Sequence, residues 1–272
     1  MSSNGNNPRP THEEQQSARR ERLQQARLAE QRSRQVRRRA VIGVSIVAAL
    51  ALAGGVTLAI SNADGGPGTP AAAKPAPEAP LVAPANTGGD GTVVVYGKPD
   101  APRTLAVYED FRCPVCQKFE TANGATVQQL ADAGTYKIEY HLAAFLDSNL
   151  GGRGSITALA AAGAALNQGV DEFKKFHDVL YANQPAETSD GFGDVNRILD
   201  LAGQVPGLKT EAFTEAVKNG TYLPWAEKVA AAFNNSGVTG TPTMKLDGKK
   251  LTLFDGNGPV SADNFKQQVG AA

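Results

Sequence analysis

The sequence FRCPVC at residues 111–116 contains the only two cysteines of this 272-residue chain. Two thiols at this spacing can close a small disulfide ring and reopen it, so each sulfur can attack, leave or resolve a mixed disulfide with another protein. A framework of structural disulfides needs more cysteines, as does a zinc site with four cysteine ligands. Gln117 follows Cys116 where a c-type haem attachment needs histidine. The sequence therefore predicts a redox-active dithiol formed by Cys113 and Cys116.

Pro114 places this dithiol at the start of a helix, because proline fits the first helical turn, where its missing N–H costs nothing. Apolar residues then recur near helical spacing until Gly134, which is suited to end the run. A helix amino end stabilises a thiolate, so we expect the pKa of Cys113 to lie below the ~8.5 of a free cysteine. Cys113 is the expected nucleophile and Cys116 the more buried, resolving thiol. A purely structural disulfide is the alternative, although so small a loop restrains the unfolded chain little.

Short runs rich in Val, Leu, Ile and Tyr predict β-strands on both sides of this helix. They are residues 92–96, 105–108 and 136–142. The second and third runs flank the predicted helix, so strand, helix and strand form one unit with the dithiol at its first turn. We therefore predict one α/β domain over residues 92–272.

The second half of this domain is predicted to be mostly helical. From about residue 155 to 237 the pattern fits four or five short helices separated by glycines. Structureless connections of this length are uncommon in compact domains, so we interpret the block as an inserted helical subdomain. Asp247-Gly248 then predicts a hairpin between strands at 241–246 and 250–254, and Ser261 is suited to cap a last helix.

The first 91 residues have a different composition. Residues 1–39 hold ten Arg and four Glu, so this segment carries +6 and the remainder −6 in a chain of net charge zero. With few large apolar residues it cannot form a core, and we interpret it as a solvated basic tail rather than a nucleic-acid-binding arm. Residues 61–91 are rich in Pro, Gly and Ala and predict an extended linker.

Residues 40–60 are 21 consecutive uncharged residues, AVIGVSIVAALALAGGVTLAI. At about 1.5 Å per residue a helix of this length spans a hydrocarbon core of ~30 Å. Arginines precede the segment and none follow it closely, which predicts a single-pass anchor with a cytoplasmic amino terminus and everything after residue 60 outside the membrane. A cleaved signal peptide is the alternative, for which the segment and its leader are long.

The stretch YEDFRCPVC at residues 108–116 resembles the active-site segment of bacterial DsbA-like thiol:disulfide oxidoreductases, which are thioredoxin-fold proteins with a helical insertion. TGTPT at residues 239–243 is similar to the loop whose proline is cis in this superfamily and lies against the active disulfide. The resemblance implies a thioredoxin-like fold, a cis bond before Pro242, and a backbone at Thr241 that binds an extended substrate as an added strand. It implies no cofactor beyond the disulfide of the two cysteines, and no metal.

Two positions depart from the pattern of this family. Many relatives carry an acid six residues before the first cysteine, which moves protons to and from the buried thiol, and here that residue is Val107. Strong oxidants often have histidine between the cysteines, whereas this chain has Val115, which predicts a less extreme reduction potential. Glu109 and Asp110 lie nearby, but acids at a strand end are usually solvated, and we expect that of both.

We expect the remaining candidate residues to have structural rather than catalytic or ligand-binding roles. His141 and His177 have no partner cluster in the sequence, so we expect each to be structural or exposed rather than a metal ligand. GGRG at residues 151–154 lacks the Lys-Ser/Thr of a phosphate-binding P-loop and is interpreted as a loop. Trp225 is expected in the core.

The sequence supports the hypothesis of a membrane-anchored, extracytoplasmic thiol:disulfide oxidoreductase. Its expected partners are secreted proteins with free thiols and a membrane redox partner that resets the dithiol, with no nucleic acid. Disulfides persist outside the cytoplasm, which favours oxidation. A reductase or isomerase using the same dithiol is one alternative. A non-catalytic, redox-sensitive binding module is another; a copper-binding form has little support, since Met244 is the only methionine after the first residue.

Overall fold

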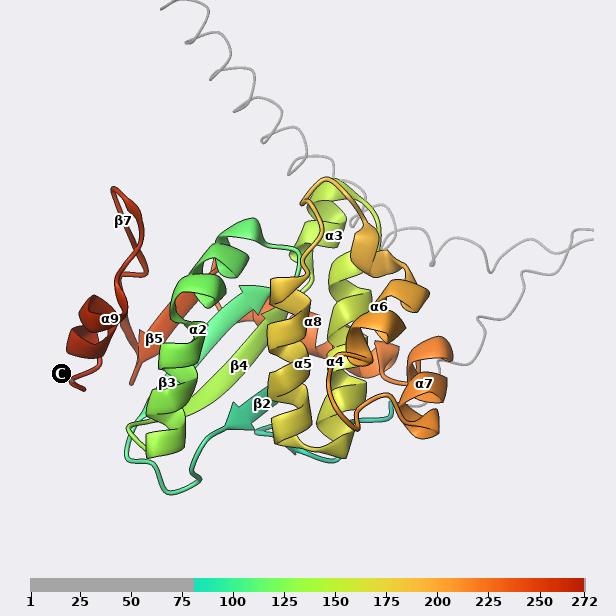
Figure 1. The fold of residues 1–272 in the computed structure, drawn as a ribbon, viewed down its shortest axis with the longest axis horizontal. Helices are drawn as coiled ribbons and strands as arrows, with labels where there is room; N and C mark the ends of the chain where they lie inside the picture. Colours follow the sequence, from blue (N-terminus) through green and yellow to red (C-terminus); the bar gives the residue numbers. More distant parts are fainter. Residues whose placement is uncertain (1–80, 272) are drawn as a thin grey trace, which may run out of the picture. The chain divides into compact units, whose positions relative to one another are not determined.

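The computed structural model describes residues 81–271, in which a central β-sheet has helices on both faces (Figure 1). The strands follow the order β1-β2-β4-β3-β5-β6 across the sheet. Their bounds are β1 (Thr87–Gly88), β2 (Val93–Tyr96), β3 (Thr104–Asp110), β4 (Lys137–Ala143), β5 (Thr243–Leu246) and β6 (Lys249–Lys250). β3 and β4 are parallel, and the other neighbours are antiparallel. This confirms the predicted α/β class.

The unit formed by β3, α2 (Pro114–Ala133) and β4 carries the dithiol at its first turn, as predicted. Cys113 is the N-cap of α2, and Gly134 ends the helix in the left-handed conformation, with φ 86°. The buried face of α2 includes Cys116 and Phe119, whereas Val115 is 40 % exposed. The dithiol therefore sits at the carboxyl end of β3, where one cysteine faces the core.

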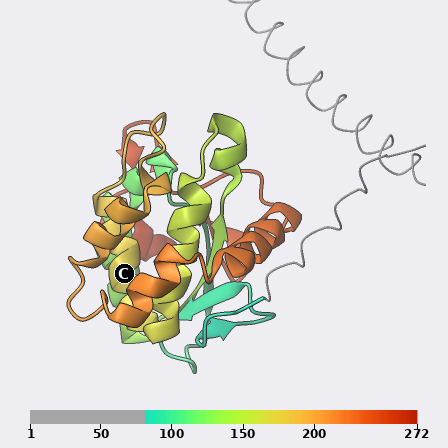
Figure 2. The same cartoon turned by 90° about the vertical axis from the view of Figure 1, so that its right-hand side faces the viewer.

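The predicted helical insertion lies between β4 and β5. It contains α3 (Phe145–Leu150), α4 (Gly154–Gln168), α5 (Val170–Ala182), a 3-10 turn η1 (Gly191–Gly193), α6 (Val195–Ala202), α7 (Glu211–Lys218) and α8 (Leu223–Asn235). The alanine-rich α4 is almost wholly buried and packs against α5, α7 and α8. Figures 1 and 2 show α2 and α5 on one face of the sheet and α8 on the other. Trp225 of α8 is fully buried, as expected.

The carboxyl-terminal part forms two hairpins and a helix. The first turns at Asp247 and Gly248, whose positive φ angles of 49° and 83° suit the two-residue turn that was predicted. The second strand of this hairpin is shorter than the predicted 250–254. It covers Lys249–Lys250, the Leu251 N–H donates to the Met244 carbonyl at 2.9 Å, and the chain then leaves β5 with Leu251 and Leu253 buried.

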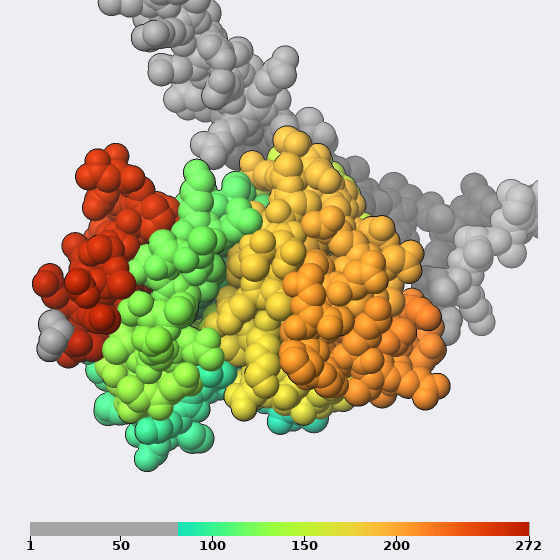
Figure 3. Space-filling view, in the orientation of Figure 1, coloured from blue at the N-terminus to red at the C-terminus, as the bar shows by residue number. Residues whose placement is uncertain are grey.

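A second, short hairpin of β7 (Phe254–Asp255) and β8 (Gly258–Pro259) precedes α9 (Ala262–Gln268). Ser261 caps α9, since its Oγ accepts the N–H of Asn264 at 3.2 Å. Figure 3 shows this segment, in red, against α2, in green, which has the insertion on its other side.

The predicted basic tail at 1–39, the membrane helix at 40–60 and most of the linker lie outside the described residues. Within residues 81–271, no helix is both long enough and apolar enough to cross a membrane. The folded part begins earlier than the predicted boundary at residue 92. Thr87 and Gly88 pair with β2, and the Asn86 side chain donates to the Leu166 carbonyl at 2.8 Å.

The contact between α4 and Trp225 gives a stability prediction. A Cβ at Gly163 would lie 2.6 Å from Trp225 Cζ3, so Gly163→Ala should overpack the core at a cost of about 1–3 kcal/mol. Most of this range exceeds the ~1 kcal/mol that alanine gains over glycine in a helix, so a net loss is expected. The matched control is Gly124→Ala in α2, whose Cβ would meet only the movable carboxylate of Glu120. Denaturant unfolding should show a loss for Gly163→Ala alone, and equal stability of the two variants would contradict the packing.

Candidate active site

Cys113 and Cys116 are both free thiols, and they occupy different environments. Cys113 lies at the amino end of α2, where its Sγ accepts the N–H of Cys116 at 3.4 Å. Cys116 lies one turn further into the helix and is only 1 % exposed, against 6 % for Cys113. Both cysteines are thus buried, the second more completely than the first.

This asymmetry separates the acidities of the two thiols. Hydrogen bonding from Cys116 lowers the pKa of Cys113 from 9.0 to about 6; burial opposes the shift, and Thr241 and the N–H groups of Cys116 and Val115 reinforce it. Burial raises the pKa of Cys116 well above its ordinary value, and its proximity to Cys113 adds to the effect. At neutral pH the arrangement can therefore hold a thiolate on Cys113 and a thiol on Cys116, which is the division of roles expected for nucleophile and resolving group.

The loop before β5 faces this dithiol. The Thr241-Pro242 peptide bond is cis, as the resemblance implies. The antiparallel pairing of Tyr108 with Thr243 brings the loop beside the end of β3, and the Cys113 thiol lies 3.5 Å from the Thr241 carbonyl oxygen. Thr241 Oγ1 is buried and has no hydrogen-bond partner among the described residues. The structure thus brings together the two motifs that the sequence singled out, although 128 positions separate Cys113 from Thr241.

The active-site turn is also held by the helical insertion, which the sequence did not indicate. Gln184 Nε2, just after α5, donates to the carbonyl oxygens of Phe111 at 2.7 Å and Cys113 at 3.1 Å. The Tyr181 hydroxyl donates to the Asp110 carbonyl at 3.3 Å. These bonds pair carbonyl groups of the turn that would otherwise be buried without partners.

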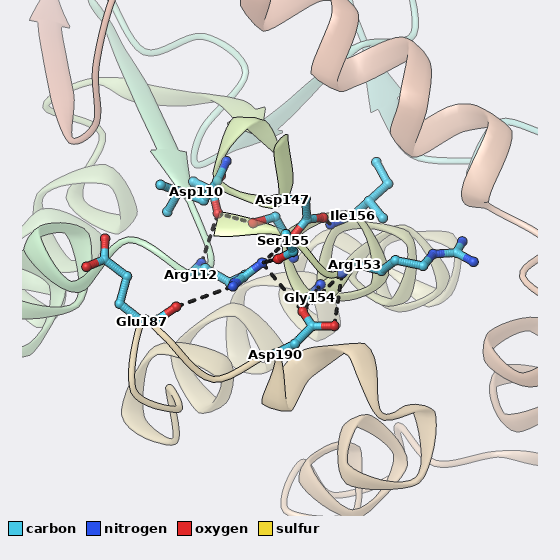
Figure 4. A network of polar contacts seen from close by, with 11 residues as sticks. Asp110, Arg112, Asp147, Arg153, Gly154, Ser155, Ile156, Glu187 and Asp190 are labelled. Atoms are coloured by element: carbon cyan, nitrogen blue, oxygen red, sulfur yellow. Dashed lines mark hydrogen bonds and ion pairs between the residues drawn. The ribbon is translucent and has the colours of Figure 1, made fainter. Parts of the chain in front are cut away.

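Arg112, immediately before Cys113, is the centre of a polar network (Figure 4). Its side chain is only 2 % exposed, and Nη1 donates to Asp147 Oδ1 at 2.6 Å and to the Gly151 carbonyl at 2.9 Å. Nη2 donates to the Glu187 carbonyl at 3.3 Å. The residue beside the first cysteine is therefore fixed both to α3 with its C-cap and to the loop that contains Glu187.

The backbone of the GGRG segment binds a carboxylate of the same chain, that of Asp190. The N–H groups of Arg153 and Gly154 donate to the Asp190 carboxylate at 3.0 and 2.7 Å (Figure 4). A side chain at Gly152 would overlap that carboxylate. The interpretation of this segment as a loop holds, and its glycines make room for Asp190.

The prediction that Glu109 and Asp110 are solvated is wrong, because both are buried. β3 extends through Asp110, and residues of the insertion bond to the side chains at its end. The Asp110 carboxylate accepts from Ser155 Oγ at 2.6 Å, the Arg112 N–H at 2.9 Å and the Leu146 N–H at 3.3 Å. Burial raises the pKa of Asp110 to about 6, although these hydrogen bonds oppose the shift.

His177 of α5 is buried, in agreement with its structural interpretation, but it has an ionic partner that the sequence did not indicate. Its Nε2 lies 2.7 Å from Glu109 Oε1, and its Nδ1 lies 3.0 Å from Asp178 Oδ1. Burial alone would lower the pKa of His177, but Glu109 and Asp178 raise it to about 10. The histidine is therefore an imidazolium between two carboxylates. His141 differs, since it is partly exposed and stacks on Tyr108 with ring centres 4.5 Å apart.

One group of side chains among residues 81–271 has the composition of a metal site. Ligand atoms of Glu120, His177 and Asp178 lie within 4.8 Å of one another. Both imidazole nitrogens already face carboxylates, however, and Lys174 Nζ donates to Asp178 at 2.5 Å. Positive charge at this place is supplied by the imidazolium and the ammonium group, so the residues do not fit a metal ion.

Comparison with known proteins agrees with this geometry. The model of a protein family described as thioredoxin matches residues 90–271. The chain belongs to the thioredoxin family. It is 27 % identical over 161 residues to disulfide bond formation protein D of Bacillus subtilis, a match that covers 59 % of this chain and 70 % of that protein.

Solved structures give the same result. DsbA from Mycobacterium tuberculosis, in its reduced form, matches with a TM-score of 0.54 and 26 % identity, covering 66 % of this chain and 91 % of that one. Oxidised BdbD from Bacillus subtilis matches with a TM-score of 0.54 and 26 % identity, covering 65 % and 90 %. The protein is a DsbA-like, thioredoxin-fold thiol:disulfide oxidoreductase.

The acidity of Cys113 can be measured directly. We expect the ultraviolet absorbance of the thiolate in the reduced protein to titrate with a midpoint near pH 6, and Cys113→Ala to remove this step. Because the folded-state pKa is depressed, ionisation contributes stability that is complete above about pH 9 and is lost as the pH falls through 6. The stability of the reduced protein relative to the oxidised one should therefore rise over this interval. A midpoint near that of a free cysteine would contradict the helix-end geometry.

Proposed function

We propose that this protein oxidises thiols of secreted proteins outside the cytoplasmic membrane, with Cys113 as the nucleophile and Cys116 as the resolving thiol. The observation that carries the proposal is the opposite shift of the two thiol pKa values, lowered at Cys113 and raised at Cys116. A stabilised thiolate favours the reduced enzyme and so makes the disulfide a better oxidant. The names of the curated relatives, which are disulfide bond formation proteins, support the same direction.

The proposed cycle begins with a client thiolate that attacks Cys113 Sγ of the oxidised enzyme. The bond between Cys113 and Cys116 breaks, and a mixed disulfide with the client forms. The second thiol of the client then attacks the client sulfur, which leaves the client oxidised and both cysteines reduced. A membrane redox partner takes the two electrons and restores the enzyme disulfide, so that no cofactor beyond this disulfide is needed.

Substrate contact is assigned to the cis-proline loop. The Thr241 carbonyl lies 3.5 Å from the Cys113 sulfur, so an extended client segment bound along Thr241 and Pro242 would place its own sulfur within reach. Pro114 and Val115 complete the surface around Cys113, since Val115 is exposed. Because Val115 is uncharged, the reduction potential depends instead on the amino end of α2 and on the hydrogen bonds to the Cys113 sulfur.

The cellular location is proposed from residues 1–91. The uncharged segment at 40–60 would anchor the protein by one helix, the arginine-rich tail would remain in the cytoplasm, and the proline-rich linker would hold the domain away from the bilayer. Attachment near a membrane redox partner would raise its effective concentration and so speed reoxidation.

A disulfide reductase or isomerase is the second candidate, and Val115 and Val107 favour it, because neither supplies the ionisable group often found in strong oxidants. Measurement of the reduction potential against glutathione separates the two. We expect a potential above that of the glutathione pool, and a value well below it would assign the protein to reduction.

The catalytic roles can be tested by trapping intermediates. Cys116→Ala removes the resolving thiol and leaves the Cys113 thiolate, so this variant should accumulate mixed disulfides with secreted proteins when expressed as the full chain. Cys113→Ala is the matched control and should accumulate none. Non-reducing electrophoresis followed by mass spectrometry identifies the adducts, and their absence from Cys116→Ala would favour a non-catalytic binding module.

A further inference from the structure

A hollow in the helical insertion lies apart from the dithiol and has no part in the cycle proposed above. Its volume is about 250 Å³. Its walls come from the start of α4, the turn η1 with the first residue of α6, the carboxyl end of α7 and the start of α8. Figure 1 shows α7 on the opposite side of α4 and α5 from α2, which carries the cysteines. This hollow is called here the α4–α7 cleft.

The floor of the cleft is apolar and continues the core of the insertion. It is formed by side chains that are buried or packed against the core, namely Ala160, Ala161, Val195, Ala216, Val217 and Leu223. Alanine at three of these positions leaves the space between the helices that a larger side chain would fill. An apolar group placed in the cleft would remove the partly exposed members of this set from water, which is favourable.

The two charged residues that line the cleft are both cationic. Arg153 precedes α4, and Lys218 ends α7. Both are exposed, and neither side chain forms an ion pair with another residue in the range 81–271. Figure 4 shows the Arg153 side chain directed away from Asp190, although its N–H binds that carboxylate. The cleft therefore combines an apolar floor with two positive charges that have no acidic partner in this part of the chain.

The acids nearest in sequence to the lining residues are engaged elsewhere, and none of them lines the cleft. Asp190 is bound by the backbone of the GGRG segment. Asp194 caps α6, and Glu215 accepts from the Asn219 side chain at 3.3 Å. The charge of Arg153 and Lys218 is thus available to an anion that enters from outside.

Arg153 also connects the cleft with the network around the active-site turn. Its N–H and that of Gly154 donate to Asp190, whose Oδ1 lies 3.4 Å from Arg112 Nη1. Arg112 directly precedes Cys113 in the chain. The cleft is therefore joined to the segment that holds the active-site turn, although neither cysteine lines it.

We propose that the α4–α7 cleft binds a small molecule with an apolar body and one carboxylate. The body, a single ring or a short aliphatic chain, lies on the apolar floor, and the carboxylate bonds to Arg153 and Lys218. Sites for drug-sized ligands usually have roughly 300–1,000 Å³, so this smaller cleft admits one ring or short chain. A cationic ligand would meet two like charges, and inorganic phosphate would leave the floor uncovered.

The test uses phenylacetate as the probe and the full chain reconstituted in lipid nanodiscs. Saturation-transfer difference NMR should show saturable binding with a dissociation constant of about 0.1–10 mM, as expected for a ligand of this size. Empty nanodiscs correct for partition of the probe into lipid. Phenylacetamide has the same shape without the charge and should bind more weakly, and phenethylamine should show no saturable binding.

Two variants assign the binding to the cleft. Lys218→Gln removes one of the two charges and should weaken phenylacetate binding roughly threefold to tenfold. Ala216→Leu fills the hollow and should abolish binding. Lys218 is exposed and Ala216 is partly exposed, so both variants should fold. Lys209→Gln is the matched control, because Lys209 Nζ lies 3.7 Å from Asp200 and outside the cleft, and it should bind as the wild type does.

Several results would overturn the inference. They are a signal no larger than that of empty nanodiscs, equal affinity for phenylacetate and phenylacetamide, unchanged binding in Ala216→Leu, or the same loss in Lys209→Gln as in Lys218→Gln. The inference does not rest on the proposed function. Cys113→Ala should abolish mixed disulfides and still bind phenylacetate, so the two failures are distinguishable.

Discussion

Burial of the carboxyl end of β3 is the constraint on which the site depends. Residues 109–112 are all buried although three of them are ionisable, and each ionised group must find a partner there. The insertion supplies those partners: His177 for Glu109, Ser155 for Asp110 and Asp147 for Arg112. The helical subdomain is therefore part of the active site, because without it the strand that presents the dithiol would end in unpaired charges.

The same burial gives the two cysteines different properties. A short helix-initiating turn places Cys113 where backbone N–H groups and the Cys116 thiol point at its sulfur, while Cys116 is enclosed by α2, β3 and α5. Both shifts have local causes that do not depend on the side chains between the cysteines. This explains how a dithiol with the uncharged pair Pro114 and Val115 still has one acidic thiol and one protected thiol.

The sequence was sufficient for features that depend on local patterns. The helix start at Pro114, the turn at Asp247-Gly248 and the cap at Ser261 each rest on a few adjacent residues, and the structure agrees with them. The partners of Glu109 and Arg112 could not be found in this way, since they lie 68 and 35 positions away and single side chains carry no periodic signal. Two adjacent acids at a strand end look solvated unless the insertion that covers them is known.

A buried imidazolium between two carboxylates costs desolvation free energy, and replacing such groups by apolar side chains is often neutral or stabilising. Stability alone therefore does not account for Glu109 and His177, because the surrounding rings of Phe111, Phe173 and Tyr140 would accept an apolar pair. The pair is better explained by the position of Glu109 at a buried strand end, where an ionised carboxylate requires a partner and His177 of α5 provides it. Glu109 in turn adds to the effect of burial on Cys116, so the charge at the strand end helps to keep that thiol protonated.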